Sequence, residues 1–186
     1  MQPNETKVDV PKLGRVGPSE MPAMARLHVA THSALFVYGA PGTGKTASVE
    51  AAYPMAGVGN VVVRACGLDD RGDISCLDPL SHPDYVLTKV AKWLHEAMHA
   101  TVPTVYVFDD FGHAAADVQA VLMKPLYERR MHTGQEFPDH VHFALTANDV
   151  CHAAGAQPVI SAAVSRCTVL EYVPDQDWLI QHGSAN

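Results

Sequence analysis

Residues 33–49 read SALFVYGAPGTGKTASV, and this stretch is the most informative part of the sequence about the fold. Its first seven residues are nearly all apolar up to a glycine, as in a buried strand, and its last residues favour a helix. The GxxxxGK[ST] pattern lies between them. Its glycines let backbone N–H groups curl around phosphate oxygens, at the positive end of the helix that follows. The stretch therefore predicts a phosphate-binding loop.

Two side chains of this loop carry distinct chemistry. Lys45 is expected to contact the β and γ phosphates, and Thr46 is expected to offer its hydroxyl to Mg²⁺. The predicted phosphate-binding residues are consecutive: Gly39, Ala40, Pro41, Gly42, Thr43, Gly44, Lys45, Thr46 and Ala47.

A second acidic motif should end a neighbouring strand, because Mg²⁺ needs a carboxylate near it and the attacking water needs an orienting group. The segment VYVFDD, residues 105–110, supplies both. Asp109 is the predicted metal residue, and Asp110 is the predicted catalytic residue that polarises water.

Composition suits one soluble domain. The chain has 186 residues, 47% of them hydrophobic, and a formal net charge of −7, which argues against a strong non-specific grip on nucleic acid. A local basic patch is left open. The four cysteines form no CxxC pair, no N-terminal stretch resembles a secretory signal, and no apolar run approaches the ~18 residues of a membrane span. We expect a cytoplasmic protein that contacts no membrane.

Strand-like and helix-like segments alternate along the chain. Strands are predicted at residues 33–39, 60–65, 104–110, 140–148 and 167–173, and helices at 20–32, 44–55, 82–100 and 114–130. The first three strands are almost continuously apolar, as expected of strands covered on both faces. The alternation predicts a three-layer α/β/α fold with a five-stranded parallel sheet. The predicted organisation is a leader with a short helix (1–32), a core (33–175) and a tail (176–186).

The order of these motifs resembles that of the AAA+ ATPases, over about residues 33–175. The segment ALTAND ends a strand where that family places its first sensor, so the resemblance gives Asn148 a catalytic role at the γ phosphate. Ser165, Arg166 and Cys167 match the SRC signature of clamp loaders, in which the arginine reaches the ATP site of the neighbouring subunit. The resemblance thus implies ATP and Mg²⁺ as cofactors, catalysis by Lys45, Asp110, Asn148 and Arg166, and a homo-oligomeric ring, with six subunits the expected number.

Within that family, residues 116–148 are similar to the MoxR-like branch, especially its short phage and prophage proteins. That branch carries a small hairpin that faces the central axis of the ring. Residues 130–139, RMHTGQEFPD, have suitable turn residues with Gly134 near the tip, although a plain loop fits them too. AAA+ proteins usually continue into a helical lid, and residues 176–186 are too few to form one, so we expect the lid to be either absent or truncated here.

The resemblance implies a remodelling ATPase or chaperone that acts on an unidentified protein substrate. One alternative is a DNA-replication accessory ATPase of the clamp-loader or helicase-loader kind, suggested by the SRC match. Another is a nucleotide-gated assembly protein with little turnover, suggested by Asp110, since relatives usually have the longer Glu there.

A different chemistry is hinted at by HEAMH, residues 95–99, which has the HExxH spacing of zinc peptidases. On a helix, His95 and His99 fall on a polar stripe with Lys92, a cation that disfavours bound zinc, and no third ligand follows nearby. We interpret the pair as a solvated helix face.

Overall fold

The computed structural model describes residues 14–65, 75–77, 88–131, 134–149 and 167–174. The elements in chain order are β1 (Arg15–Val16), α1 (Met21–Thr31), β2 (Ala34–Gly39), α2 (Lys45–Ala52), the 3-10 turn η1 (Pro54–Ala56), β3 (Asn60–Ala65), β4 (Ser75–Leu77), β5 (Thr88–Val90), α4 (Lys92–Met98), β6 (Thr104–Asp109), the 3-10 turn η3 (Phe111–His113), α5 (Ala116–Glu128), β7 (Val141–Asn148) and β8 (Cys167–Tyr172).

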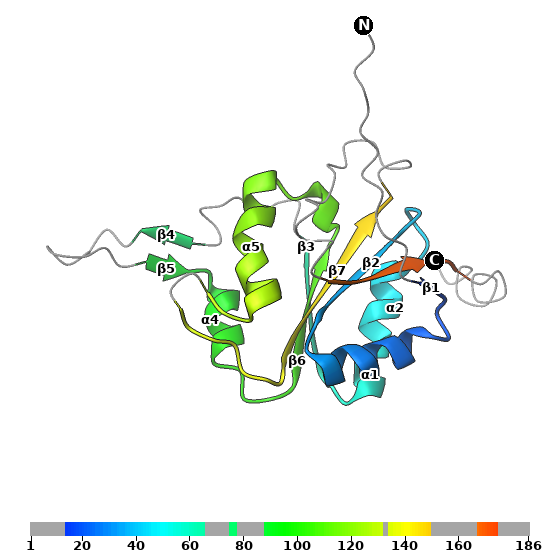
Figure 1. Cartoon of the computed structure of the whole chain (residues 1–186), viewed down its shortest axis with the longest axis horizontal. Helices are drawn as coiled ribbons and strands as arrows, with labels where there is room; N and C mark the ends of the chain where they lie inside the picture. Colours follow the sequence, from blue (N-terminus) through cyan, green and yellow to red (C-terminus); the bar gives the residue numbers. More distant parts are fainter. Residues whose placement is uncertain (1–13, 66–74, 78–87, 132–133, 150–166, 175–186) are drawn as a thin grey trace, which may run out of the picture.

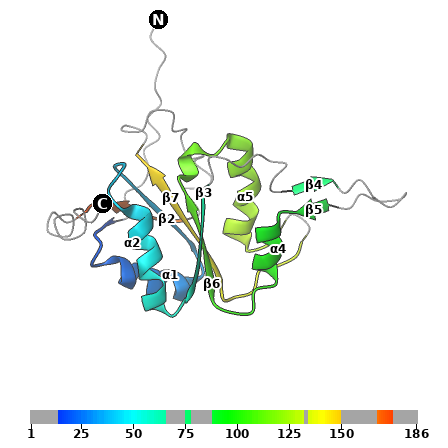
Figure 2. The same ribbon diagram turned by 180° about the vertical axis from the view of Figure 1, so that it is seen from behind.

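The main sheet has the order β1-β8-β2-β7-β6-β3, and every neighbouring pair in it is parallel. One apolar cluster packs α4 and α5 on one face, and a second packs α1 and α2 on the other. Figures 1 and 2 show the resulting three layers, with α1 and α2 on one side of the sheet and α4 and α5 on the opposite side. The predicted α/β/α class is therefore confirmed. No helix among the described residues is long and apolar enough to span a bilayer.

The described residues form six strands in this sheet, so the prediction of five was wrong. The additional strand, β1, comes from the leader and pairs Arg15 with Glu171 and Val16 with Tyr172. Val16 is buried, and the Nε of Arg15 lies 3.2 Å from a carboxylate oxygen of Glu171. Two residues are too few to show the alternation of apolar and polar side chains that predicts a strand, and prolines and glycines surround them. They form a strand because they pair with the open edge of β8.

Two further predictions needed correction. Residues 60–65 form the edge strand β3, whose side chains are exposed or half-buried, with Val63 39% exposed. Val61 and Val62 each pack against one of the two apolar clusters, so both faces of this strand are covered only in part. The helix predicted over 82–100 is the short α4, preceded by β5, which pairs antiparallel with β4. Ala91 has extended backbone angles just before α4, and pairing with β4 overrides the helical pattern of the residues before it.

The described residues of the segment 130–139, which are 130–131 and 134–139, double back as a small hairpin. Arg130 and Glu136 form an antiparallel bridge, and the N–H of Met131 donates to the carbonyl of Gln135 over 2.7 Å. Gly134 has φ +88°, a conformation that glycine adopts without strain, and its N–H donates to the carbonyl of Met131 over 2.9 Å. The described residues of this segment therefore form the hairpin that the turn residues favour, and not a plain loop.

Candidate functional site

The candidate site lies at the carboxyl end of the parallel strands, where β2, β6 and β7 finish side by side. Gly39 and Asn148 are register partners at the ends of β2 and β7, and Asp109 ends β6. In open parallel sheets this end is where ligands bind. Strand order therefore gathers residues that are far apart in the sequence.

The loop backbone needs its glycines at defined positions. A Cβ on Gly39 would lie 2.7 Å from the carbonyl oxygen of Tyr172, so β2 approaches β8 too closely there for any other residue. Gly42 and Gly44 have φ of +71° and +79°, and Gly44 is the N-cap of α2. Thr43 closes the loop through a hydrogen bond from its hydroxyl to the carbonyl of Ala40 over 2.8 Å. The loop thus delivers Lys45 and Thr46 at the helix N-terminus.

Lys45 is only 6% exposed, and its ammonium group donates to three oxygens. The acceptors are the carbonyls of Gly39 at 3.2 Å and Ala40 at 2.7 Å, and Oδ1 of Asn148 at 2.9 Å. Burial lowers the pKa of Lys45 below its usual value, and the carboxylates of Asp110 and Asp109 oppose that shift. Phosphate oxygens would replace neutral acceptors with charged ones, which form stronger hydrogen bonds with an ammonium group.

Asp109 is held by two threonine hydroxyls. Thr46 donates to its Oδ1 over 2.5 Å, and Thr146 donates to the same oxygen over 2.7 Å. The motif analysis predicted Thr46 and Asp109 but missed Thr146, which lies within β7 and is 1% exposed. Its position two residues before Asn148 puts both side chains on the same face of the strand, and this period could have revealed it.

The donor set at this point suits Mg²⁺. A threonine hydroxyl and a carboxylate oxygen lie side by side at the start of α2. Mg²⁺ in proteins is usually held by one or two carboxylates, with water and substrate phosphates completing its shell. The described residues contain no group of three or more His, Cys, Asp or Glu side chains suited to a metal, but such a group is not required here.

Asp110 follows in an unusual backbone conformation. Its φ of +51° and ψ of +42° are left-handed, which costs free energy for a residue with a Cβ. Its Oδ1 accepts a hydrogen bond of 2.9 Å from the Asn148 amide, and Nδ1 of His113 lies 4.0 Å away. Asn148 therefore forms hydrogen bonds with both Lys45 and Asp110, and it links these two predicted catalytic residues.

The fourth predicted catalytic residue, Arg166, and its neighbour Ser165 lie outside the described residues. Cys167 begins β8, and burial raises the pKa of its thiol to about 12. The motif's cysteine is therefore a partly buried thiol that packs against the core and is protonated at physiological pH.

The histidine pair of the HEAMH segment lies on α4 and at its C-cap, outside the elements that carry these residues. His95 and His99 are exposed and stack on each other with ring centroids 4.2 Å apart, while Trp93, Leu94 and Ala97 are buried. Lys92 is also exposed and pairs with Glu96 at 3.5 Å. The glutamate of the motif thus faces a lysine in the described structure.

Replacing Thr146 with Val should weaken the response to Mg²⁺. The side-chain volume is kept, but Asp109 loses one of its two hydroxyl donors. We expect the Mg²⁺ concentration for half-maximal nucleotide binding or turnover to rise by about 10-fold, as for residues that orient metal ligands elsewhere. A magnesium titration at fixed nucleotide measures this. Thr146→Ser restores a hydroxyl and should respond like the wild type, and equal midpoints for the Val and Ser variants would contradict the role.

Comparison with known proteins gives a match only among solved structures. No protein-family model matches it, and no curated protein does. Among solved structures it is similar to a protein from Cytophaga hutchinsonii ATCC 33406 described as a candidate ATPase, with a TM-score of 0.57 and 18% sequence identity. The similarity covers 92% of this chain and 52% of that protein, so this chain spans about half its length. At this identity the likeness supports the fold.

Proposed function

We propose that this protein binds ATP with Mg²⁺ at the carboxyl end of the sheet and hydrolyses it. The observation that carries the proposal is the convergence of Lys45, Thr46, Asp109 and Asn148 within hydrogen-bonding distance at one helix N-terminus. Lys45 would bind the β and γ phosphates, and Thr46 and Asp109 would hold Mg²⁺, which neutralises charge on the phosphates. Asp110 and Asn148 would orient the attacking water.

We further propose that the protein acts as a MoxR-like AAA+ ATPase in a homo-oligomeric ring of six subunits, which remodels a protein partner. The support is the motif order and the hairpin at residues 130–139. Arg166 would reach the ATP site of the adjacent subunit and offset the charge of the transferring phosphoryl group. The site of one subunit would then be incomplete without its neighbour.

Phosphate release measured against protein concentration tests this. Specific activity should climb with concentration in the wild type, and Arg166→Ala should lower it by about 10³-fold or more, as for arginines that act this way. Arg26→Ala is the matched control, since Arg26 is exposed and its described contact is one long hydrogen bond of 3.4 Å to a carbonyl.

Mixing two inactive variants separates a shared site from a self-contained one. Lys45→Ala subunits keep Arg166, and Arg166→Ala subunits keep an intact phosphate loop. In a randomly mixed ring about a quarter of the interfaces would combine both intact parts, so activity should return to roughly that fraction. A mixture as inactive as its components would contradict action between subunits.

A second candidate is favoured by the geometry of Asp110. Its carboxylate is bound to Asn148 and its backbone is left-handed, so the aspartate is held by the protein rather than free to approach water. A protein with this arrangement would bind ATP and hydrolyse it slowly. The ATP-bound state would then hold the subunits of an assembly together. Stoichiometric ATP retained through purification, with negligible phosphate release at any concentration, would favour this candidate.

A further inference from the structure

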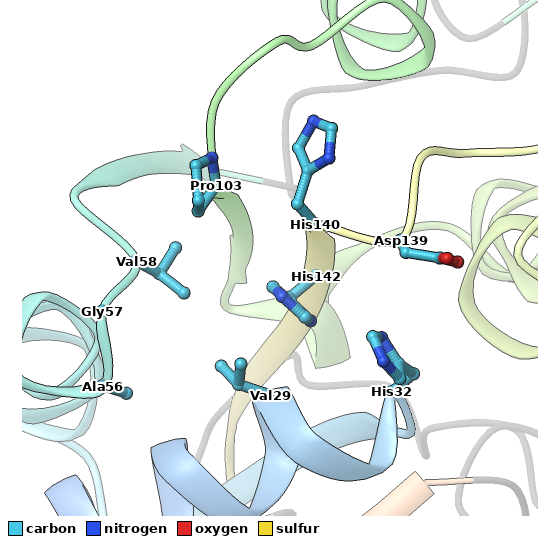
Figure 3. A pocket seen from close by; sticks show the side chains of 9 residues that line it. All are labelled: Val29, His32, Ala56, Gly57, Val58, Pro103, Asp139, His140 and His142. Carbon is cyan, nitrogen blue, oxygen red and sulfur yellow. The ribbon is translucent and has the colours of Figure 1, made fainter.

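A pocket lies at the opposite end of the sheet from the candidate nucleotide site. It has a volume of about 380 Å³, and Figure 3 shows its lining. Val58, Pro103 and His140 come just before β3, β6 and β7, so they mark the amino ends of parallel strands whose carboxyl ends carry Asp109 and Asn148. Val29 and His32 from the end of α1 complete one side. The pocket and the candidate nucleotide site lie at opposite ends of β7, so they are separate sites.

The walls of the pocket are mainly apolar, formed by Val29, Ala56, Val58 and Pro103. A volume of this size can hold a compound of one or two rings. Apolar walls beside a small number of polar side chains, here three histidines and an aspartate, suit a small-molecule ligand. The walls therefore favour a ligand with an apolar, planar body.

His142 provides polarity within these walls. Its residue is 2% exposed, and its Nδ1 is buried without a hydrogen-bond partner among the described residues. In Figure 3 its ring lies between Val29, Val58 and His32, facing the pocket. An unpaired imidazole nitrogen costs free energy, and a small turn of the ring would let a ligand hydroxyl or N–H pair with it.

The charge around the pocket argues against an ionic ligand. Burial lowers the pKa of His142 to about 4, with Arg129, His32 and His140 adding to the shift, so its ring is neutral at physiological pH. The exposed carboxylate of Asp139 at the rim repels anions. Since the described residues offer no group of three metal-binding side chains, the polar atoms suit a neutral donor better than a metal ion.

We propose that this pocket binds a small, neutral aromatic group that carries a hydroxyl or ring N–H, of the phenol or indole class. The ring would lie between Val29 and Val58, and the donor would pair with the imidazole of His142. Both a free compound and the side chain of a tyrosine or tryptophan in another protein have this chemistry.

Nuclear magnetic resonance of the histidine imidazoles tests the proposal with p-cresol as the probe. Saturable shifts of the His142 signals are expected, with a dissociation constant of about 0.1–1 mM for a ligand of this size. Toluene, which lacks the hydroxyl, should bind about fivefold more weakly. No saturable shift of these signals at 10-fold higher p-cresol would overturn the proposal.

Three variants locate the binding. Val29→Trp fills the pocket and should abolish the shifts, whereas Leu27→Trp, on the exposed side of the same helix, should leave them unchanged. His142→Phe keeps an aromatic ring, so p-cresol and toluene should bind it equally. Binding unchanged by Val29→Trp, or a preference for p-cresol that survives His142→Phe, would refute the assignment.

N-acetyl-tyrosinamide distinguishes the two sources. Binding at least as tight as that of p-cresol supports a protein side chain as the natural occupant. Binding of p-cresol alone supports a free compound. None of these binding measurements requires nucleotide. A negative result would therefore refute the proposed pocket ligand without bearing on the proposed ATPase activity.

Discussion

Replacing Lys45 with Ala is expected to lower the rate of ATP turnover by about 10²–10³-fold, the range for removing one preorganised donor from developing charge. The buried ammonium group is within reach of Asn148 and two loop carbonyls, and phosphate oxygens would take over these contacts. Nucleotide affinity should fall as well, because Lys45 is the one cation among the described residues of the proposed phosphate site. Phosphate release at saturating and limiting ATP, together with equilibrium binding of a fluorescent ATP analogue, measures both effects.

Lys92→Ala is the matched control for this change. Lys92 is exposed on α4 and pairs with Glu96, well away from the phosphate loop. Its loss removes the same charge from the chain but should leave turnover unchanged. Equal activities of the two variants would show that Lys45 does not act on phosphate.

The free energy of unfolding should fall by about 4 kcal/mol between pH 7.5 and 5, through two buried histidines. Burial lowers the pKa of His28 to about 3 and that of His142 to about 4, from 6.5 in the unfolded chain. Neighbouring charges reinforce both shifts, Arg129 among them. Above pH 6.5 both rings are neutral in either state, and their contribution to stability is fully present. As the pH falls below 6.5, only the unfolded chain takes up protons, and stability is lost progressively through the folded pKa values.

Urea unfolding at pH 7.5, 6 and 5 measures this dependence. His142→Phe removes one of the two groups and should flatten the pH dependence by about 2 kcal/mol over the same range. His99→Gln, which changes an exposed ring, is the control and should follow the wild type. A His142→Phe variant with the full wild-type dependence would mean that the buried ring does not cause it.

The sequence predicted the elements whose signals are local. The phosphate loop could be predicted because glycine positions, a preceding apolar strand and a following helix agree, and its geometry requires Gly39, Gly42 and Gly44 where the pattern has them. Asp109 and Asn148 could be placed because polar residues at the ends of parallel strands meet at one edge.

The sequence failed where partners distant in the chain decide the structure. β1 exists because β8 has an open edge, and β5 exists because β4 pairs with it, so neither shows a period of its own. Thr146 was missed because most of its neighbours in β7 are apolar, and only its two-residue spacing to Asn148 marks the hydroxyl that donates to Asp109. The left-handed backbone of Asp110 also has no local signal, since aspartate is common in ordinary turns.

The short strand β1 has a consequence for handling the protein. It covers one edge of the sheet, while β3 at the other edge carries Val63 in a partly exposed position. A chain trimmed to begin after residue 17 would leave the edge of β8 without the strand that pairs with it, and an open strand edge can recruit strands from other molecules. Besides burying Val16 in the core, these two residues are thus expected to protect the protein against intermolecular β-pairing and aggregation.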